Sequence, residues 1–226
     1  MSFDRWRSLV DGAEIDVGSD IPDSVVAQYD ASAEDSTGSI NTITDLIGTF
    51  DLSGSAAVID NGINDLKTYR FDGSVTMSNS DINIGTPNVT IMVVQKQGSL
   101  SSSEGYYDVT GSTGNRRQLD ERDSGSTYRL FHGESTAEGG TADGEPHIIE
   151  HHGNANGTND RLVVDGAEVI NADVGDGTID EFELAFSNTS QREIDVGELI
   201  HYDDPTEDLI SDEVGRLSEK WGITLS

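Results

Sequence analysis

Short apolar runs, many of them alternating with polar residues, recur along the chain from Ser24 onward. They are rich in Val, Ile, Thr and aromatic residues, and clusters of Gly, Asn, Asp and Ser separate them. This pattern is typical of β-strands joined by turns. Strands are expected at VVAQYDA, INTITDLIG, AAVID, TYRFDG, VTIMVVQ, TYRLFHG, PHIIEHH, DRLVVDG, DEFELAFS and IDVGELIHYD. The run VTIMVVQ (Val89–Gln95) is apolar at successive positions, so we expect a central strand buried on both faces.

The last segment follows a helical pattern instead. Beyond Pro205, apolar residues recur at spacings of four, three and four, which places them on one face of a helix. These residues are Ile210, Val214, Leu217 and Trp221. Thr206 is a suitable N-cap and Gly222 a suitable C-cap. The sequence therefore predicts an all-β chain that ends in one short helix.

Two polar segments interrupt the strand pattern. Residues 1–23 contain Gly and Pro, and only Trp6, Leu9 and Val10 stand out as apolar positions that would form one short amphipathic turn. We interpret residues 1–23 as an arm or linker and residues 24–226 as one domain. Residues 98–115 are rich in Ser and Gly, which predicts a long exposed loop.

The net charge of the chain limits the kinds of partner it can bind and indicates the environment in which it folds. Asp and Glu number 43 against 13 Lys and Arg, which gives a formal net charge of -30. This balance argues against nucleic acid and anionic membrane faces as partners. Such a chain repels itself at ordinary salt, whereas molar salt shortens the Debye length to about 3 Å. We therefore expect a protein of a salt-loving organism or its virus; an acidic protein from an ordinary host is the alternative.

Missing features exclude further classes of chemistry. The chain has no cysteine, which removes disulfides, thiolate zinc sites, iron–sulfur clusters and cysteine nucleophiles. No apolar run approaches the roughly 20 residues of a membrane span. The opening residues also lack the apolar core of an export signal. We expect no membrane insertion and no cofactor.

Three stretches carry a family resemblance. VVAQYDASAEDSTGSINTITDLIGTFDLSG opens with a strand and an Asp-Ala-Ser turn, and NDRLVVDGAEV (Asn159–Val169) places an Asp-Gly hairpin turn between two strands. VGELIHYDDPTEDLISDEVGRLSEKWGI (Val196–Ile223) joins a closing strand to a helix. Together they resemble the concanavalin A-like (laminin-G-like) jelly-roll superfamily, and more narrowly its modules in tail, fibre and decoration proteins of tailed viruses. The resemblance implies an antiparallel jelly-roll sandwich over about residues 24–226, without a catalytic or metal-binding motif.

One acidic motif keeps an enzymatic alternative open. Glu193, Asp195 and Glu198 form E-x-D-x-x-E, close to the signature of retaining β-glucanases, which share the jelly-roll fold. That chemistry needs an acid and a nucleophile about 5–5.5 Å apart. Alternate strand positions share a face, and a bulge would return the third carboxylate to it. The position of the motif in the closing strand and the scarcity of tryptophan argue against catalysis.

Two other clusters invite a metal interpretation. Asp176–Glu183 is similar to the second half of a calcium-binding helix–loop–helix loop, but apolar residues hold two of the ligand positions, so a hairpin turn leading into a strand is favoured. His147 and His151 would share one face of a strand while His152 points the other way. A zinc site needs further convergent ligands, and nothing marks them. We predict no metal site.

The candidate glycan-binding residues are Tyr106, Tyr107, Arg116 and Arg117. Flat aromatic rings stack on sugar rings, and arginines bind hydroxyl groups, as loops on a rigid sandwich often do. Packing within the loop is the alternative interpretation.

The candidate assembly anchor is formed by Arg5, Trp6, Arg7, Leu9 and Val10. Its apolar side chains would fill a pocket on a shell or tail protein, and its arginines would contact an acidic particle surface. A disordered terminus is the alternative.

The leading hypothesis is a non-enzymatic surface protein on the virion of a halophilic archaeal virus, made in the host cytoplasm. Decoration protein, turret and tail fibre stay open, and a symmetric homo-oligomer is expected in each case. Its partners would be other virion proteins, with host-surface glycans as a second candidate. The alternatives are a cell-surface carbohydrate-binding module of a halophile and a glucanase-like glycoside hydrolase.

Overall fold

The computed structural model describes residues 22–82, 89–97, 105–110, 116–122, 127–132, 135–153, 159–174, 181–187, 190–191 and 193–226, and the strands β1 (Arg7–Val10) and β2 (Ala13–Asp16). Most of these residues lie in antiparallel β-strands, and an α-helix lies near the C-terminus. The predicted all-β class with a closing helix is confirmed. No helix within the described residues is long and apolar enough to span a membrane.

Fifteen of the described strands form one continuous hydrogen-bonded sheet. Its path runs in the order β12-β11-β10-β9-β16-β7-β5-β6-β19-β8-β13-β14-β15, while β3 pairs with β19 and β4 pairs with β5. The bounds are β3 Val25–Asp30, β4 Gly38–Ile43, β5 Leu52–Ile63, β6 Leu66–Asp72, β7 Met77–Asn79, β8 Val89–Gln97, β9 Gly105–Thr110, β10 Arg116–Arg122, β11 Thr127–His132, β12 Ser135–Gly139, β13 Pro146–His152, β14 Asp160–Val164, β15 Ala167–Ala172, β16 Glu181–Leu184 and β19 Glu193–Asp203.

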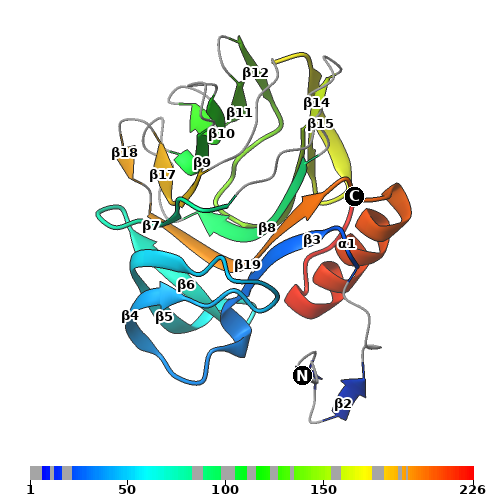
Figure 1. Cartoon of the computed structure of the whole chain (residues 1–226). Helices are drawn as coiled ribbons and strands as arrows, with labels where there is room; N and C mark the ends of the chain where they lie inside the picture. Colours follow the sequence, from blue (N-terminus) through cyan, green and yellow to red (C-terminus); the bar gives the residue numbers. More distant parts are fainter. Residues whose placement is uncertain are drawn as a thin grey trace.

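Shorter elements complete the description. A 3₁₀ turn, η1 (Ala31–Ala33), follows β3, and β17 (Phe186–Ser187) pairs with β18 (Ser190–Gln191). The large sheet folds back on itself, so that β9–β12 lie on one side of the molecule and β8 and β19 on the other (Figure 1). Its two ends, β12 and β15, come into contact. This arrangement is a β-sandwich of the jelly-roll type.

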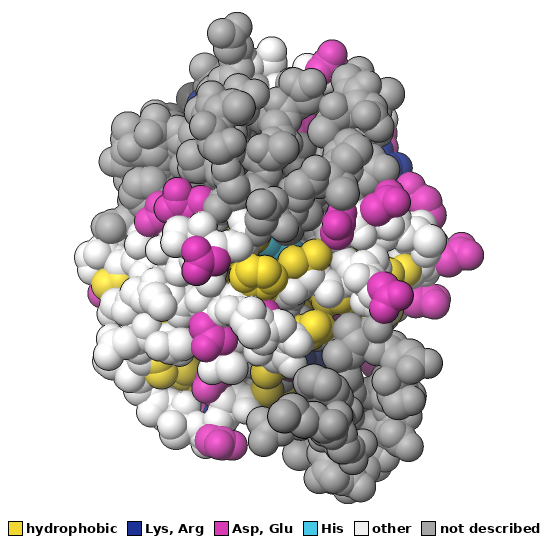
Figure 2. Space-filling model, viewed as in Figure 1, with side chains coloured by type: hydrophobic (Ala, Val, Ile, Leu, Met, Phe, Trp, Pro, Cys, Tyr) yellow, Lys and Arg dark blue, Asp and Glu magenta, His cyan; other side chains and the backbone are white. Residues whose placement is uncertain are grey.

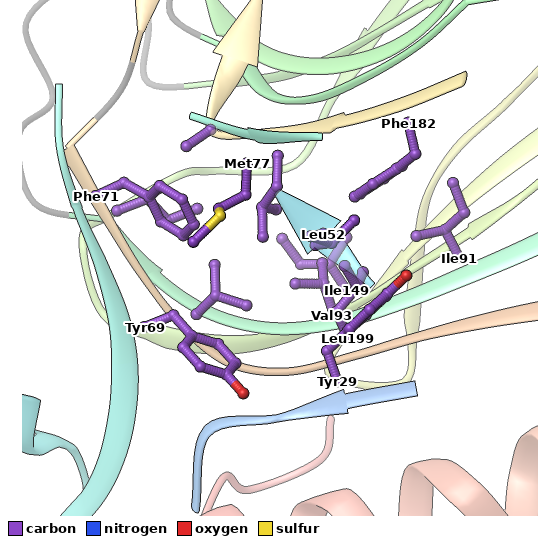
Figure 3. Close-up of a cluster of buried hydrophobic side chains, with 14 of the residues drawn as sticks. Tyr29, Leu52, Tyr69, Phe71, Met77, Ile91, Val93, Ile149, Phe182 and Leu199 are labelled. Atoms are coloured by element: carbon purple, nitrogen blue, oxygen red, sulfur yellow. The ribbon is translucent and has the colours of Figure 1, made fainter. Parts of the chain in front are cut away.

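The main hydrophobic core fills the space between the two halves of the folded sheet. Side chains from opposite halves point toward one another there (Figure 3). The buried residues that Figure 3 labels are Tyr29, Leu52, Tyr69, Phe71, Met77, Ile91, Val93, Ile149, Phe182 and Leu199. Burial of such side chains is the main favourable contribution to folding.

Strand β8 is buried on both faces, as its uninterrupted apolar run predicts. Ile91 and Val93 belong to the main core, whereas Met92 and Val94 belong to a second cluster beneath the helix. The molecule therefore has three layers at this point, namely the two halves of the sandwich and the helix on the outer face of β8 and β19 (Figure 1).

The helix α1 (Glu207–Trp221) confirms the C-terminal prediction. Its buried side chains are Ile210, Val214, Leu217 and Trp221. The Thr206 hydroxyl accepts a hydrogen bond from the Leu209 N–H at 3.2 Å, and Gly222 ends the helix in the left-handed region at φ 64°.

Two predictions of local structure are wrong. Gly105–Thr110 is strand β9, paired with β10 and β16, so Tyr106 and Tyr107 lie in a strand rather than in a long loop. The aromatic and β-branched content of GYYDVT outweighs the Ser- and Gly-rich flanks. Within residues 1–23, β1 pairs with β2 in an antiparallel register in which Val10 is opposite Ala13, so Leu9 and Val10 lie in a strand rather than in the predicted short amphipathic turn.

Candidate functional site

A bulge in β19 brings the three carboxylates of the acidic motif toward one face. Asp195 pairs with Lys96 of β8, whereas Glu198 pairs with Val94, so Gly197 is an extra residue between two same-side positions. The predicted role of a bulge in returning the third carboxylate to the face of Asp195 is confirmed.

Glu198 nevertheless lies beneath α1 and is only 1% exposed. Its carboxylate accepts hydrogen bonds from the Gln28 amide at 2.7 Å, Arg216 Nη2 at 2.5 Å, Lys220 Nζ at 2.7 Å and the Trp221 indole N–H at 3.2 Å. These contacts tie the closing strand to the helix that follows it.

The electrostatic surroundings keep Glu198 ionised. Burial alone would raise the pKa of Glu198, but Lys220 and Arg216 outweigh burial and lower it to about 2. A glycosidase acid has to carry a proton near neutral pH, which requires a raised pKa. Glu198 therefore has the opposite electrostatic character from a general acid.

The other two carboxylates of the motif do not complete an open acid–base pair with Glu198. Asp195 forms a two-pronged ion pair with Arg70, at 2.7 Å to Nε and 2.6 Å to Nη2. Glu193 is exposed at the start of the strand. The described geometry thus holds Asp195 and Glu198 in ion pairs, and the role it supports for these two carboxylates is structural.

The lack of a side chain at Gly197 lets α1 pack against the bulge. The sequence pattern does not indicate this role. A Cβ built on Gly197 would lie 2.6 Å from the Cη2 atom of Trp221, closer than carbon atoms approach. The indole ring, which is fully buried, lies directly over this backbone.

The histidines of β13 have separate environments. His147 contacts Asp165 through Nδ1 at 2.6 Å and Asp143 through Nε2 at 2.9 Å, and these carboxylates, Asp165 foremost, raise its pKa to about 8 against the effect of burial. His151 is buried, with its Nε2 atom 3.5 Å from Asp160. Within the described residues, no group of three or more His, Asp or Glu side chains is placed to hold a metal ion.

His152 faces a different surface. Its Nδ1 atom lies 3.1 Å from the Thr90 hydroxyl and its Nε2 atom 3.0 Å from Glu150, so a carboxylate, an imidazole and a hydroxyl form one hydrogen-bonded chain. This chain ends at a cavity of about 350 Å³. The cavity is lined by Thr90, His152, Gly153, Asn159, Arg161, Pro205, Glu207 and Ile210. The sequence does not indicate this cavity, because its lining residues come from separate elements, among them β8, β13, β14 and α1.

The predicted glycan-binding residues lie on neighbouring strands. Tyr107 pairs with Leu119 of β10 and Arg117 pairs with Val109, so Tyr107 and Arg117 share a face two pairs apart. Tyr106 falls where the β9–β10 register shifts, and Arg116 occupies the opposite face from Arg117. Their side chains lie outside the described part of the structure, so their binding role stays a prediction.

Three of the five residues of the predicted anchor lie in the N-terminal hairpin. Arg5 and Trp6 are outside the described residues, and Arg7, Leu9 and Val10 belong to β1, whose backbone pairs with β2. The side chains of β1 are also outside the description, and the anchor stays a prediction. Of the segment Asp176–Glu183, the residues from Glu181 onward belong to strand β16, whereas the predicted hairpin turn falls on residues 175–180, which lie outside the described residues.

Comparisons with known proteins identify the fold. Searches of protein-family models and of curated proteins give no match. Among solved structures, domain 4 of AbnA, an extracellular arabinanase of Geobacillus stearothermophilus, in complex with arabinotriose, aligns with a TM-score of 0.61 and 15% identity, over 84% of this chain and 97% of that one.

Two larger proteins contain a similar domain. Trypanosoma rangeli sialidase in complex with sialic acid aligns with a TM-score of 0.64 and 12% identity over 96% of this chain and 36% of that chain. Botulinum neurotoxin type C, whose cell entry depends on two ganglioside molecules, aligns with a TM-score of 0.60 and 10% identity. This alignment covers 86% of this chain and 51% of that chain. The chain therefore spans about a third to a half of these two proteins. At such identities the comparisons establish a β-sandwich of the jelly-roll type.

Proposed function

We propose that this protein is a non-catalytic carbohydrate-binding module. The observation that carries the proposal is the contrast between two places on the sandwich. Two of the three carboxylates of the glucanase-like motif, Asp195 and Glu198, are paired with cations. The cavity beside α1, in contrast, is lined by hydrogen-bonding side chains, among them Thr90, Asn159 and Arg161. Polar groups that converge on a concave site are typical of small-molecule recognition.

The similar structures support this proposal over the virion hypothesis. Each of the three is described with a carbohydrate or glycolipid, namely arabinotriose, sialic acid or gangliosides. The alignment with the arabinanase domain covers 97% of that domain. Fold likeness by itself assigns no function, so the proposed binding role depends on the cavity.

The setting of the module is a separate proposal. The acidic composition and the resemblance to tailed-virus modules favour the virion surface of a halophilic archaeal virus, with other virion proteins as partners. The similar structures give this setting no support, and a carbohydrate-binding module at the cell surface is the alternative. Mass spectrometry of purified particles distinguishes the two settings, because only a virion protein is retained at fixed copy number.

A glycan array in molar salt tests the binding proposal. We expect the full chain to bind a defined subset of glycans and to leave them intact, as checked by reducing-end analysis after overnight incubation. Failure to bind any glycan would overturn the proposal. Release of new reducing ends by the wild-type protein would reinstate the hydrolase alternative.

A further inference from the structure

We infer that the cavity beside the start of α1 binds one uncharged sugar unit of a glycan, an inference that rests on the proposed carbohydrate-binding function. The cavity measures about 350 Å³. Small-molecule sites typically span about 300–1,000 Å³, so this one is at the small end. It has room for a single sugar unit at the end of a chain rather than for a long glycan.

Thr90 is oriented by the hydrogen-bonded chain behind it. With a single proton on Nε2, the His152 imidazole donates to Glu150 and accepts from the Thr90 hydroxyl through Nδ1. The lone pairs of Thr90 Oγ1 then remain to accept a hydrogen bond from a ligand. Through His152, the buried Glu150 carboxylate thus sets the direction in which the Thr90 hydroxyl donates at the cavity wall.

Arg161, Glu207 and Asn159 supply the other polar groups. Arg161 Nη2 lies 3.0 Å from Glu207 Oε1, and among the described residues this carboxylate is the one partner of a guanidinium that has five N–H donors. The Asn159 amide N–H₂ donates to Asn171, which leaves its carbonyl oxygen as an acceptor. Sugar hydroxyl groups both donate and accept, so they match such a mixed set.

An apolar wall completes the site. Pro205 and Ile210 line the cavity beside the polar groups, and the Ile210 side chain belongs to the cluster beneath α1. A sugar ring has one C–H-rich face that packs against such a surface, while its hydroxyl edge meets hydrogen-bonding groups.

The charge of the site favours uncharged sugars over acidic ones. The lining contains one arginine, already paired with Glu207, and Glu150 lies directly behind His152. A sugar carboxylate would need unpaired donors and would be repelled by these acids and by the net charge of -30. This property would separate the protein from the similar structures that are described with sialic acid or gangliosides.

Titration calorimetry of the full chain in molar salt tests the inference. The probes are arabinotriose, cellotriose, chitotriose and maltotriose as uncharged sugars, and sialyllactose and trigalacturonate as acidic ones. We expect at least one uncharged trisaccharide to bind, with both acidic probes at least tenfold weaker.

Three cavity variants locate the site. Thr90→Val removes the oriented hydroxyl at nearly constant volume, Arg161→Ala removes the donors, and Glu207→Gln changes a side chain that is 82% exposed. Each should weaken binding, the first two at least tenfold. The matched control is Arg70→Ala on β6, which removes an arginine that is 46% exposed against 34% for Arg161 and that pairs with Asp195 of β19, and this change should leave Kd unchanged. Circular dichroism confirms folding, and Glu207→Gln keeps the test valid if Thr90→Val fails to fold.

The possible outcomes distinguish the carbohydrate-binding proposal from the inference that the cavity is the binding site. If wild-type protein binds no sugar, either here or on the array, the carbohydrate-binding proposal itself fails. If it binds and all folded cavity variants retain wild-type Kd, the site is elsewhere and this inference alone is wrong. Preferred binding of sialyllactose or trigalacturonate would overturn the uncharged class.

Discussion

Glu198 holds a negative charge in the interior because two cations, an amide and an indole N–H contact it. Removing one partner from a buried ion pair typically costs about 3–5 kcal/mol, since the remaining charges stay desolvated. We expect Glu198→Gln to lower the free energy of unfolding by about that amount in denaturant titrations at molar salt.

The matched control lies on the same strand. Glu193 is exposed, so Glu193→Gln should change the free energy of unfolding by no more than about 0.5 kcal/mol. Equal effects of the two substitutions would contradict the structural role assigned to Glu198.

His201 presents the opposite case, a buried titratable group without a hydrogen-bonding partner. Its ring is fully buried between Tyr29 and Phe182, at centroid distances of 6.2 and 4.5 Å, and within the described structure neither nitrogen has a partner. Burial lowers its pKa from 6.5 to about 3. The folded protein therefore keeps this imidazole neutral over a pH range in which the unfolded chain protonates it.

This difference predicts a pH dependence of stability. Between pH 6.5 and 3 the unfolded state binds a proton that the folded state does not, so His201 lowers stability by up to about 1.4 kcal/mol per pH unit as the pH falls. Acid titration of carboxylates adds to this slope in every variant. We expect His201→Leu to show a shallower loss between pH 6.5 and 5 in chemical denaturation. An unchanged slope would mean that His201 is protonated in the folded state.

At the scale of elements, the contact between β19 and α1 depends on the absence of a side chain at Gly197. Gly197→Ala places a methyl group 2.6–2.8 Å from the Trp221 ring, and such overpacking typically costs about 1–3 kcal/mol. Gly215 offers a matched control, because a Cβ there meets nothing within 4 Å and lies in a helix. Gly215→Ala should raise stability by about 0.5–1 kcal/mol. The two thermal midpoints should therefore shift in opposite directions, and a parallel shift would be inconsistent with this packing.

The elements differ in how far the sequence alone predicts them. Strand β8 and helix α1 are predictable because each has a long, uninterrupted apolar pattern with its own period. Strand β9 is not, since Ser and Gly on both sides obscure a six-residue strand. In the sequence, the only sign of the bulge at Gly197 is the three-residue spacing between Asp195 and Glu198.

The cavity is the feature least accessible to sequence reasoning. Thr90, His152 and Arg161 come from three strands, and they meet only because of the registers in which β8, β13 and β14 pair. No spacing along the chain encodes such a register. The pairing of Glu198 with Lys220 is likewise a contact between a strand and a helix, so the acidic motif was predictable and its burial was not.

At the scale of the whole molecule, charge is the dominant property. Acidic side chains are spread over the face that Figure 2 shows, with few lysines or arginines among them. Lowering salt from 1 M to 0.1 M lengthens the Debye length from about 3 Å to about 10 Å, which strengthens repulsion among exposed carboxylates. We predict loss of cooperative folding on this dialysis, followed by circular dichroism and thermal melting. An unchanged melting temperature would contradict the hypothesis of a halophilic origin.

The central claim is that this sandwich binds a carbohydrate without cleaving it, and a crystal structure of the complex tests it most directly. Crystals grown in molar salt would be soaked with the uncharged trisaccharide that binds most tightly in calorimetry. The account predicts an intact trisaccharide with one terminal unit in the cavity, contacting Thr90 and Arg161. A sugar bound at the Tyr107 face would contradict the assigned site, and a cleaved sugar beside Glu193 and Asp195 would contradict the non-catalytic function.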